Sequence, residues 1–177
     1  MTGVQTCALP ICFPVTIIVF GSYTVPSSGI GSKPYLLKLD SDGDVIWGTN
    51  AVTQSLVRGK AISINGNEVA VSPDFHMITW AEGSYPVVPN GGADASIFRF
   101  NKTTGAYIDK TKLSSANGAS EVIGYMTTDV FGNYVVGGRF SSNLIINGST
   151  TLSSDDSESD FFVAKFGTAD CTLGLVS

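Results

Sequence analysis

The segment Thr128–Phe140 reads TDVFGNYVVGGRF, and it decides the fold class of this chain. Its first half contains Asp129 and Gly132-Asn133, residue types that tight turns favour, and its second half contains the β-formers Tyr-Val-Val and an aromatic residue. The segment Asp74–Tyr85 aligns with Asp129–Phe140 without a gap, and Thr16–Tyr23 supplies a partial third copy. We therefore expect an internal repeat of short strands and turns.

A second element follows each copy, at Tyr35–Asp40, Ser96–Asn101 and Phe162–Gly167. Each has a basic residue, then an apolar one, then Asp, Asn or Gly. In the first of them, alternation places Leu37 and Leu39 on one face and Lys38 on the other, as in a half-buried strand.

The first two copies continue through a glycine turn into another strand, whereas after Phe166 this fourth strand is weak or lost. Each unit is therefore expected to hold four short strands over about 55–60 residues. The turn and repeat residues of the pattern are Asp74, Gly83, Asp129, Gly132, Asn133 and Gly138, with Gly43 and Trp47 in the later element.

This pattern, followed by Ser159–Phe166, resembles the SBBP β-propeller repeat of bacterial secreted and surface proteins. Gly43–Trp47 resembles the closing G-x-x-x-W segment of that family. The resemblance covers most of residues 15–170, and it is weakest in the second copy, where His76-Met77 replaces Gly-Asn. It implies an all-β, incomplete β-propeller of about three blades, each a four-stranded antiparallel meander, at the bacterial cell surface or outside the cell. The rival fold is a β-sandwich, which predicts no matching of segments at one fixed offset.

The chain divides on this interpretation into five segments. Residues 1–11 resemble a translated short-read sequencing adapter, so 1–12 are taken as non-native. The remaining segments are a partial first blade at 13–57, a second blade at 58–113, a third blade at 114–171 and a tail at 172–177. A propeller arc of this kind leaves apolar faces uncovered, so we expect the chain to self-associate.

Composition excludes several classes of protein. The 177 residues carry a formal net charge of −5, which disfavours nucleic acid as a partner. The apolar run Ala8–Phe20 is shorter than the roughly 20 residues of a spanning helix, and it contains Pro10 and Pro14, so we expect no membrane span. The sequence has no Cys-x-x-Cys pair and no Cys/His cluster, so it predicts no zinc site. Whether Cys171 forms a disulfide stays open.

One short motif is a candidate metal site. Asp40, Asp42 and Asp44 alternate around Gly43 and could supply oxygen ligands to Ca²⁺, although the spacing is not that of an EF-hand. The alternative is a solvated hairpin turn. No other cofactor is predicted.

The sequence contains no catalytic signature. His76 is the only histidine, and no serine or cysteine lies in a nucleophile-elbow frame. Glu82 and Asp94 could be the paired carboxylates of a glycosidase, but the sequence does not give the distance between their carboxyl groups. Trp47 and Trp80 suit packing between blades, and with Tyr125 they could also stack on sugars. We expect a non-catalytic extracellular module that binds a protein or a glycan or acts as a scaffold. The alternatives are the propeller portion of a secreted enzyme with its catalytic residues elsewhere, and a purely structural spacer.

Overall fold

The computed structural model describes residues 18–25, 34–53, 58–75, 78–80, 83–84, 94–115, 119–146, 149–154 and 158–167. These residues form antiparallel strands and no helix, which confirms the all-β prediction. The segments 1–12 and 172–177, together with His76 and Cys171, lie outside the described residues.

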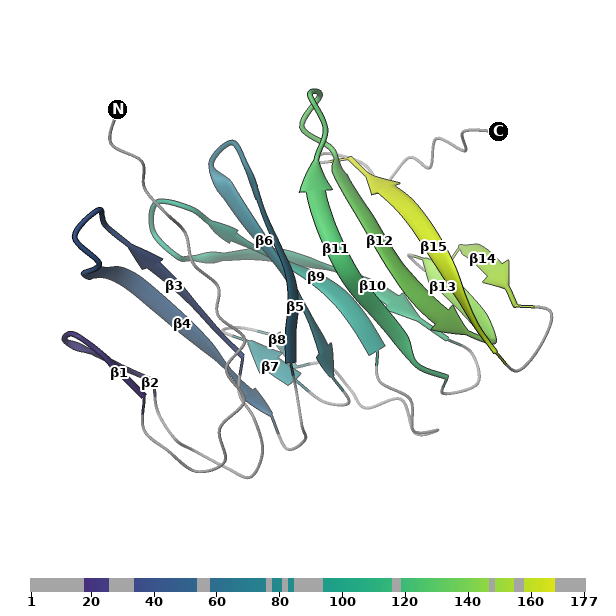
Figure 1. Cartoon of the computed structure of the whole chain (residues 1–177), viewed down its shortest axis with the longest axis horizontal. Coiled ribbons are helices and arrows are strands. Elements are labelled where there is room, and N and C mark those ends of the chain that lie inside the picture. The colour runs from purple at the N-terminus through teal and green to yellow at the C-terminus, as the bar shows by residue number, and fades with distance from the viewer. Residues whose placement is uncertain are drawn as a thin grey trace.

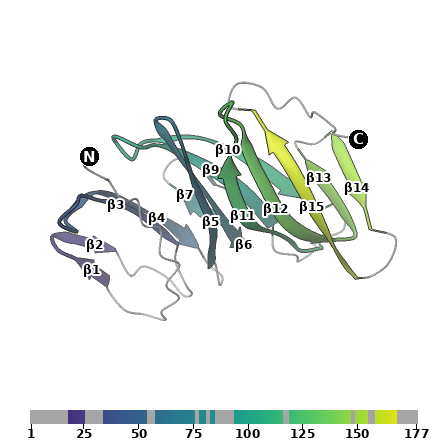
Figure 2. The same ribbon diagram turned by 45° about the horizontal axis from the view of Figure 1, so that its top comes forward.

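Within the described residues the strands form four sheets that lie side by side as successive layers (Figures 1 and 2). The first layer pairs β1 (Ile18–Phe20) with β2 (Tyr23–Val25). The second has the order β3 (Tyr35–Leu39), β4 (Val45–Thr53), β7 (Ile78–Trp80), β8 (Gly83–Ser84).

The third layer is six-stranded, in the order β14 (Thr150–Ser153), β13 (Asn143–Ile146), β10 (Tyr107–Ser114), β9 (Asp94–Asn101), β6 (Glu68–Phe75), β5 (Arg58–Asn65). The fourth has the order β11 (Glu121–Thr128), β12 (Tyr134–Ser141), β15 (Ser159–Phe166). The described strands do not close into a barrel or a propeller.

Large apolar side chains fill the spaces between the layers. Between the second and third layers, Trp80 packs on Phe98 and Phe100, with ring centroids 5.6 and 5.2 Å apart. Between the third and fourth layers, the buried side chains are Ala70, Ala95, Ile97, Leu113, Leu144 and Ile146 from one sheet and Ile123, Tyr134, Val136, Phe140, Phe162, Ala164 and Phe166 from the other. Burial of these side chains is what holds the layers together.

Strand β3 is buried on both of its faces. Leu37 and Leu39 do share one face, where they pack toward the first layer, whereas Leu36 is fully buried against the third. The prediction of a half-buried strand is therefore wrong, because a sheet lies on each side of β3.

Two of the sheets contain the same unit. We call β5, β6, β9 and β10 the second unit, and β11, β12 and β15 the third unit. Phe100 lies opposite Val69 in the second unit, and Phe166 lies opposite Tyr134 in the third. A bulge also interrupts the first strand pair of each unit, before Ala61 in the second and before Tyr125 in the third.

The gap-free alignment of Asp74–Tyr85 with Asp129–Phe140 is wrong. Asp74 lies near the end of β6, opposite Ala95 of β9, whereas Asp129 lies in the turn between β11 and β12. The second strand of the second unit is β6, and β7 and β8 form a separate hairpin on another sheet. The alignment failed because this inserted hairpin has β-forming residues of its own.

Each inserted hairpin pairs with the sheet of the preceding layer. β7 pairs with β4, where Trp80 lies opposite Ala51. β13 pairs with β10, where Ile146 lies opposite Leu113. All four side chains are buried, so each insertion both extends one sheet and contributes to the core.

Candidate functional site

The candidate calcium motif forms a hairpin turn. Oδ1 of Asp40 accepts hydrogen bonds from the backbone N–H groups of Asp42 (3.0 Å) and Asp44 (2.9 Å), and Gly43 has φ of +91°. Among the described residues, no three acidic or other metal-binding side chains gather where they could hold an ion. The structure therefore does not bring the three carboxylates together as a metal centre.

The Asp129 turn has the same construction. Oδ1 of Asp129 accepts hydrogen bonds from the N–H groups of Phe131 and Asn133, both at 2.9 Å, and Gly132 has φ of +79°. Nζ of Lys165 lies 2.6 Å from Oδ2. Side-chain hydrogen bonds hold the pKa of Asp129 well below its usual range, and the one from Lys165 has a larger effect than the one from Asn133. These contacts position the β11–β12 hairpin.

The other repeat residues serve packing. The indole Nε1 of Trp47 donates to the carbonyl of Lys102 (3.1 Å), and the indole ring covers Gly105 so closely that a Cβ there would lie 2.8 Å from it. Gly138 lies against β11, where a Cβ would come within 2.1 Å of the Val122 carbonyl oxygen. Gly83 lies opposite Trp80 in the β7–β8 pair.

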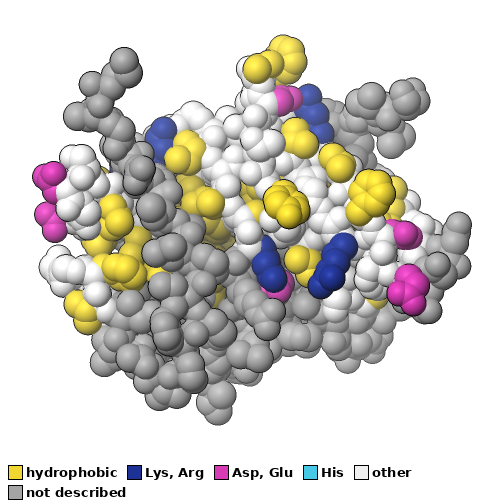
Figure 3. Space-filling model, in the orientation of Figure 1, with side chains coloured by type: hydrophobic (Ala, Val, Ile, Leu, Met, Phe, Trp, Pro, Cys, Tyr) yellow, Lys and Arg dark blue, Asp and Glu magenta, His cyan; other side chains and the backbone are white. Residues whose placement is uncertain are grey.

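A more promising surface lies on the outer side of the third unit. We call it the end face, and it comprises Val122, Tyr125, Gly137, Arg139, Phe161 and Val163 (Figure 3). Tyr125, Phe161 and Val163 are 81%, 84% and 68% exposed. Soluble proteins rarely expose several large apolar side chains side by side unless a partner covers them.

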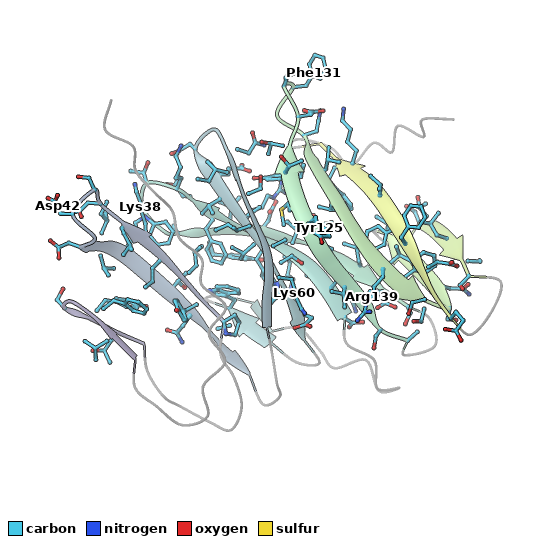
Figure 4. All side chains as sticks on the ribbon, viewed as in Figure 1. Lys38, Asp42, Lys60, Tyr125, Phe131 and Arg139 are labelled. Carbon is cyan, nitrogen blue, oxygen red and sulfur yellow. The ribbon has the colours of Figure 1, made fainter. Side chains whose placement is uncertain are left out.

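The end face contains a shallow groove of about 460 Å³. Gly124, Gly137 and Gly138 contribute to its lining, with Tyr125 on one side and Val163 on the other. Two cationic side chains, Lys60 and Arg139, lie near Tyr125 (Figure 4). Nζ of Lys60 lies 3.4 Å from Oδ2 of Asp74.

Strand alternation explains why these residues are exposed. On β15, Phe162, Ala164 and Phe166 enter the core between the third and fourth layers, so Phe161 and Val163 point outward. Phe161 was not predicted from the sequence as a functional residue. The signal was present, because a strand that is apolar at successive positions is typical of one covered on both faces.

A buried carboxyl group, that of Glu121, was also not predicted from the sequence. Glu121 is fully buried, and neither of its oxygens has a hydrogen-bond partner among the described residues. Burial raises its pKa to about 8 against the opposing effects of Ser115 and Lys112, and the nearby Asp94 acts in the same direction as burial. Asp94 is itself buried, with Nζ of Lys112 at 3.6 Å. Glu82, the proposed glycosidase partner of Asp94, lies outside the described residues.

No protein-family model matches the sequence, and a search among curated proteins finds no match. Among the described residues, no helix has the length and apolar character needed to cross a lipid bilayer. The assignment of a function therefore depends on the surface of the molecule.

Proposed function

We propose that this chain is a non-catalytic, extracellular β-propeller repeat module that binds a protein or a glycan or acts as a scaffold. Its blades would be the segments 13–57, 58–113 and 114–171. Two features support the blade interpretation. Strands β5, β6, β9 and β10 form an antiparallel meander within residues 58–114, and its outer side is covered by the sheet of β11, β12 and β15.

Contacts at the ends of the first strands of successive units, and at the turn that follows β11, also support this architecture. Nδ2 of Asn65, at the end of β5, donates to the carbonyl of Gly132 (2.7 Å), and Oγ1 of Thr128 donates to the carbonyl of Ile64 (3.3 Å). Blades that radiate from a common axis approach each other most closely at their first strands, so such contacts are expected there.

The observation that carries the binding function is the exposure of Tyr125 and Phe161 beside a glycine-lined groove. Aromatic residues are enriched at interfaces because they bury a large area with few rotatable bonds. Lys60 and Arg139 add cationic groups that could pair with acidic residues of a protein or with acidic sugars.

The test is a binding screen against a glycan array and a display library of extended peptides, with the fluorescently labelled chain. The double variant Tyr125→Ser/Phe161→Ser should lose the signal. The matched control is Val130→Ser/Phe131→Ser, which removes equally exposed apolar side chains from the tip of the β11–β12 hairpin. Equal loss in both variants, or cleavage of an array glycan by the chain, would contradict the proposal.

A further inference from the structure

We propose that Asn65-Gly66 is a site of spontaneous deamidation, and that the contact between the second and third units restrains the reaction. Such a reaction is separate from the proposed binding function and needs no ligand, because both reacting groups belong to this chain. The place of the two residues in the fold, the hydrogen bond that Asn65 makes and the charge that lies across from it each support this assignment.

The hairpin turn between β5 and β6 explains the glycine. Asn65 lies opposite Glu68, so Gly66 and Asn67 are the two residues of the loop. Gly66 has φ of +55°, which favours glycine, and a glycine at the first loop position is typical of a type II′ turn. Both loop residues are exposed to water.

The contact with the third unit explains the asparagine. Nδ2 of Asn65 donates to the carbonyl of Gly132 at 2.7 Å, from the end of β5 to the turn that follows β11. An ionised aspartate at this position could not donate. Two separate requirements of the fold therefore place an asparagine directly before a glycine at an exposed turn.

An asparagine followed by glycine can deamidate without an enzyme. The backbone nitrogen of Gly66 attacks Cγ of Asn65, the bond between Cγ and Nδ2 breaks, and ammonia leaves with the proton that the attacking nitrogen loses. Water then opens the five-membered succinimide ring at either carbonyl carbon and leaves aspartate or isoaspartate. Glycine favours this reaction because no Cβ crowds the attacking nitrogen.

The folded structure restrains the reaction at Asn65. Nδ2, which must leave, is held by the Gly132 carbonyl, and the backbone of Asn65 is paired with that of Glu68. Nζ of Lys102 donates to the carbonyl of Gly66 and holds the other side of the turn. Ring closure therefore needs local opening of the turn, and its rate depends on how often the contact between the units breaks.

The product weakens the same contact. An aspartate or isoaspartate at position 65 has no side-chain N–H to donate, and it places a carboxylate near the Gly132 carbonyl oxygen. Position 65 also lies directly across the strand pair from Glu68, where like charges are destabilising. Each conversion therefore loosens the two units irreversibly.

The first experiment follows the conversion of Asn65 in the full chain by peptide mapping with mass spectrometry, at neutral pH, in buffer and in urea that unfolds the chain. Asn65 should convert at least tenfold more slowly in the folded chain. The internal control is Asn67, which lies in the same turn but precedes Glu68 and should convert far less than Asn65 in urea. Equal rates at Asn65 in the two conditions, or no conversion of Asn65 in urea, would overturn the inference.

Two matched glycine variants separate the contact from the general stability of the chain. Gly132→Ala strains the turn that carries the acceptor carbonyl, since Gly132 has φ of +79°, and should raise the conversion of Asn65 in the folded chain severalfold. Gly43→Ala places a similar strain, at φ of +91°, in the Asp40 turn and should leave the conversion unchanged. Equal acceleration in both variants would show that the reaction follows overall unfolding, which would also overturn the inference.

Substitution tests the effect of the product. Asn65→Asp should lower the melting temperature. Asn67→Asp is the matched control and should not, because Oδ1 of Asn67 accepts a hydrogen bond from Oγ1 of Thr103 and an aspartate oxygen can do the same. An Asn65→Asp variant that is as stable as Asn67→Asp would contradict the role assigned to the Gly132 contact.

Discussion

Trp80 of β7 lies directly opposite Ala51 of β4, so a hairpin inserted into one unit closes onto the sheet before it. Leu113 and Ile146 repeat this relationship one layer further along the chain. Segments of successive units therefore share backbone hydrogen bonds within one sheet, and buried side chains hold the separate layers together.

We expect Trp80→Ala to lower the free energy of unfolding by about 3–5 kcal/mol, because the indole fills the space between two sheets and contacts Phe98 and Phe100. Urea denaturation followed by circular dichroism measures this. Trp47→Ala is the comparison, and the smaller loss expected there reflects its partial burial. A Trp80 variant as stable as the wild type would show that the hairpin does not hold the layers together.

The stability of the chain should depend on the ionisation of Glu121. Burial raises the pKa of this group in the folded state to about 8, from an ordinary value of 4.5. The folded state therefore keeps the proton longer than the unfolded state does. Its stabilising contribution is complete below pH 4.5 and is lost as the pH rises toward 8, by up to about 1.4 kcal/mol per pH unit.

Glu121→Gln should flatten this pH dependence, because the amide remains neutral throughout the range. Urea denaturation at a series of pH values measures the slope. Glu158→Gln, at an exposed position, is the control and should retain the slope of the wild type. A slope that is identical in wild type and Glu121→Gln would exclude a role for this carboxyl group.

Two glycines should respond in opposite ways to alanine. Gly132 has φ of +79°, which disfavours any side chain, so Gly132→Ala should cost about 1 kcal/mol. Gly124 has neither positive φ nor a neighbour within 4 Å of a Cβ, so Gly124→Ala should be neutral or stabilising by up to about 1 kcal/mol. Thermal unfolding of both variants measures the two effects, and equal destabilisation would count against the open space around Gly124.

Adjacent glycines on β12 provide a second pair. Gly138→Ala forces a Cβ to within 2.1 Å of the Val122 carbonyl, so the β11–β12 pair must separate, and we expect a loss of about 3 kcal/mol or more. Gly137→Ala meets only an ordinary contact at 3.9 Å and should unfold close to the wild-type temperature. Comparable melting temperatures for both variants would contradict this strand pairing.

Calcium should not stabilise the chain through Asp40. Oδ1 of Asp40 already accepts two backbone N–H groups, and the described residues contain no cluster of three metal-binding side chains. Titration with Ca²⁺ should leave the melting temperature unchanged. A rise that Asp42→Asn/Asp44→Asn abolishes would restore the calcium hypothesis for this turn.

Much of the local structure could be predicted from residue types. The Asp129 and Asp40 turns were predictable, because Asp accepts nearby backbone N–H groups and glycine tolerates positive φ. The facing of Leu37 and Leu39 followed from strand alternation. The register of the second unit could not be predicted in the same way. The hairpin that contains Trp80 has the same kind of residues as the other strands, so the sequence does not mark it as an insertion.

The exposure of the end face could not be predicted from the sequence for a related reason. Alternation shows that Phe161 and Phe162 lie on opposite faces of β15, but it does not say which face another sheet covers. The position of Glu121 was equally hidden, because its burial depends on the sheet packed against it from far along the chain.

Short antiparallel strands joined by glycine and aspartate turns follow from the residue types alone, because these features depend on the backbone preferences of residues that are close together in the chain. The packing of the sheets settles the rest: which strands share a sheet, which carboxyl group is deprived of water and which aromatic residues stay exposed. Burial depends on the neighbours that a side chain acquires, and most of those neighbours are distant in sequence.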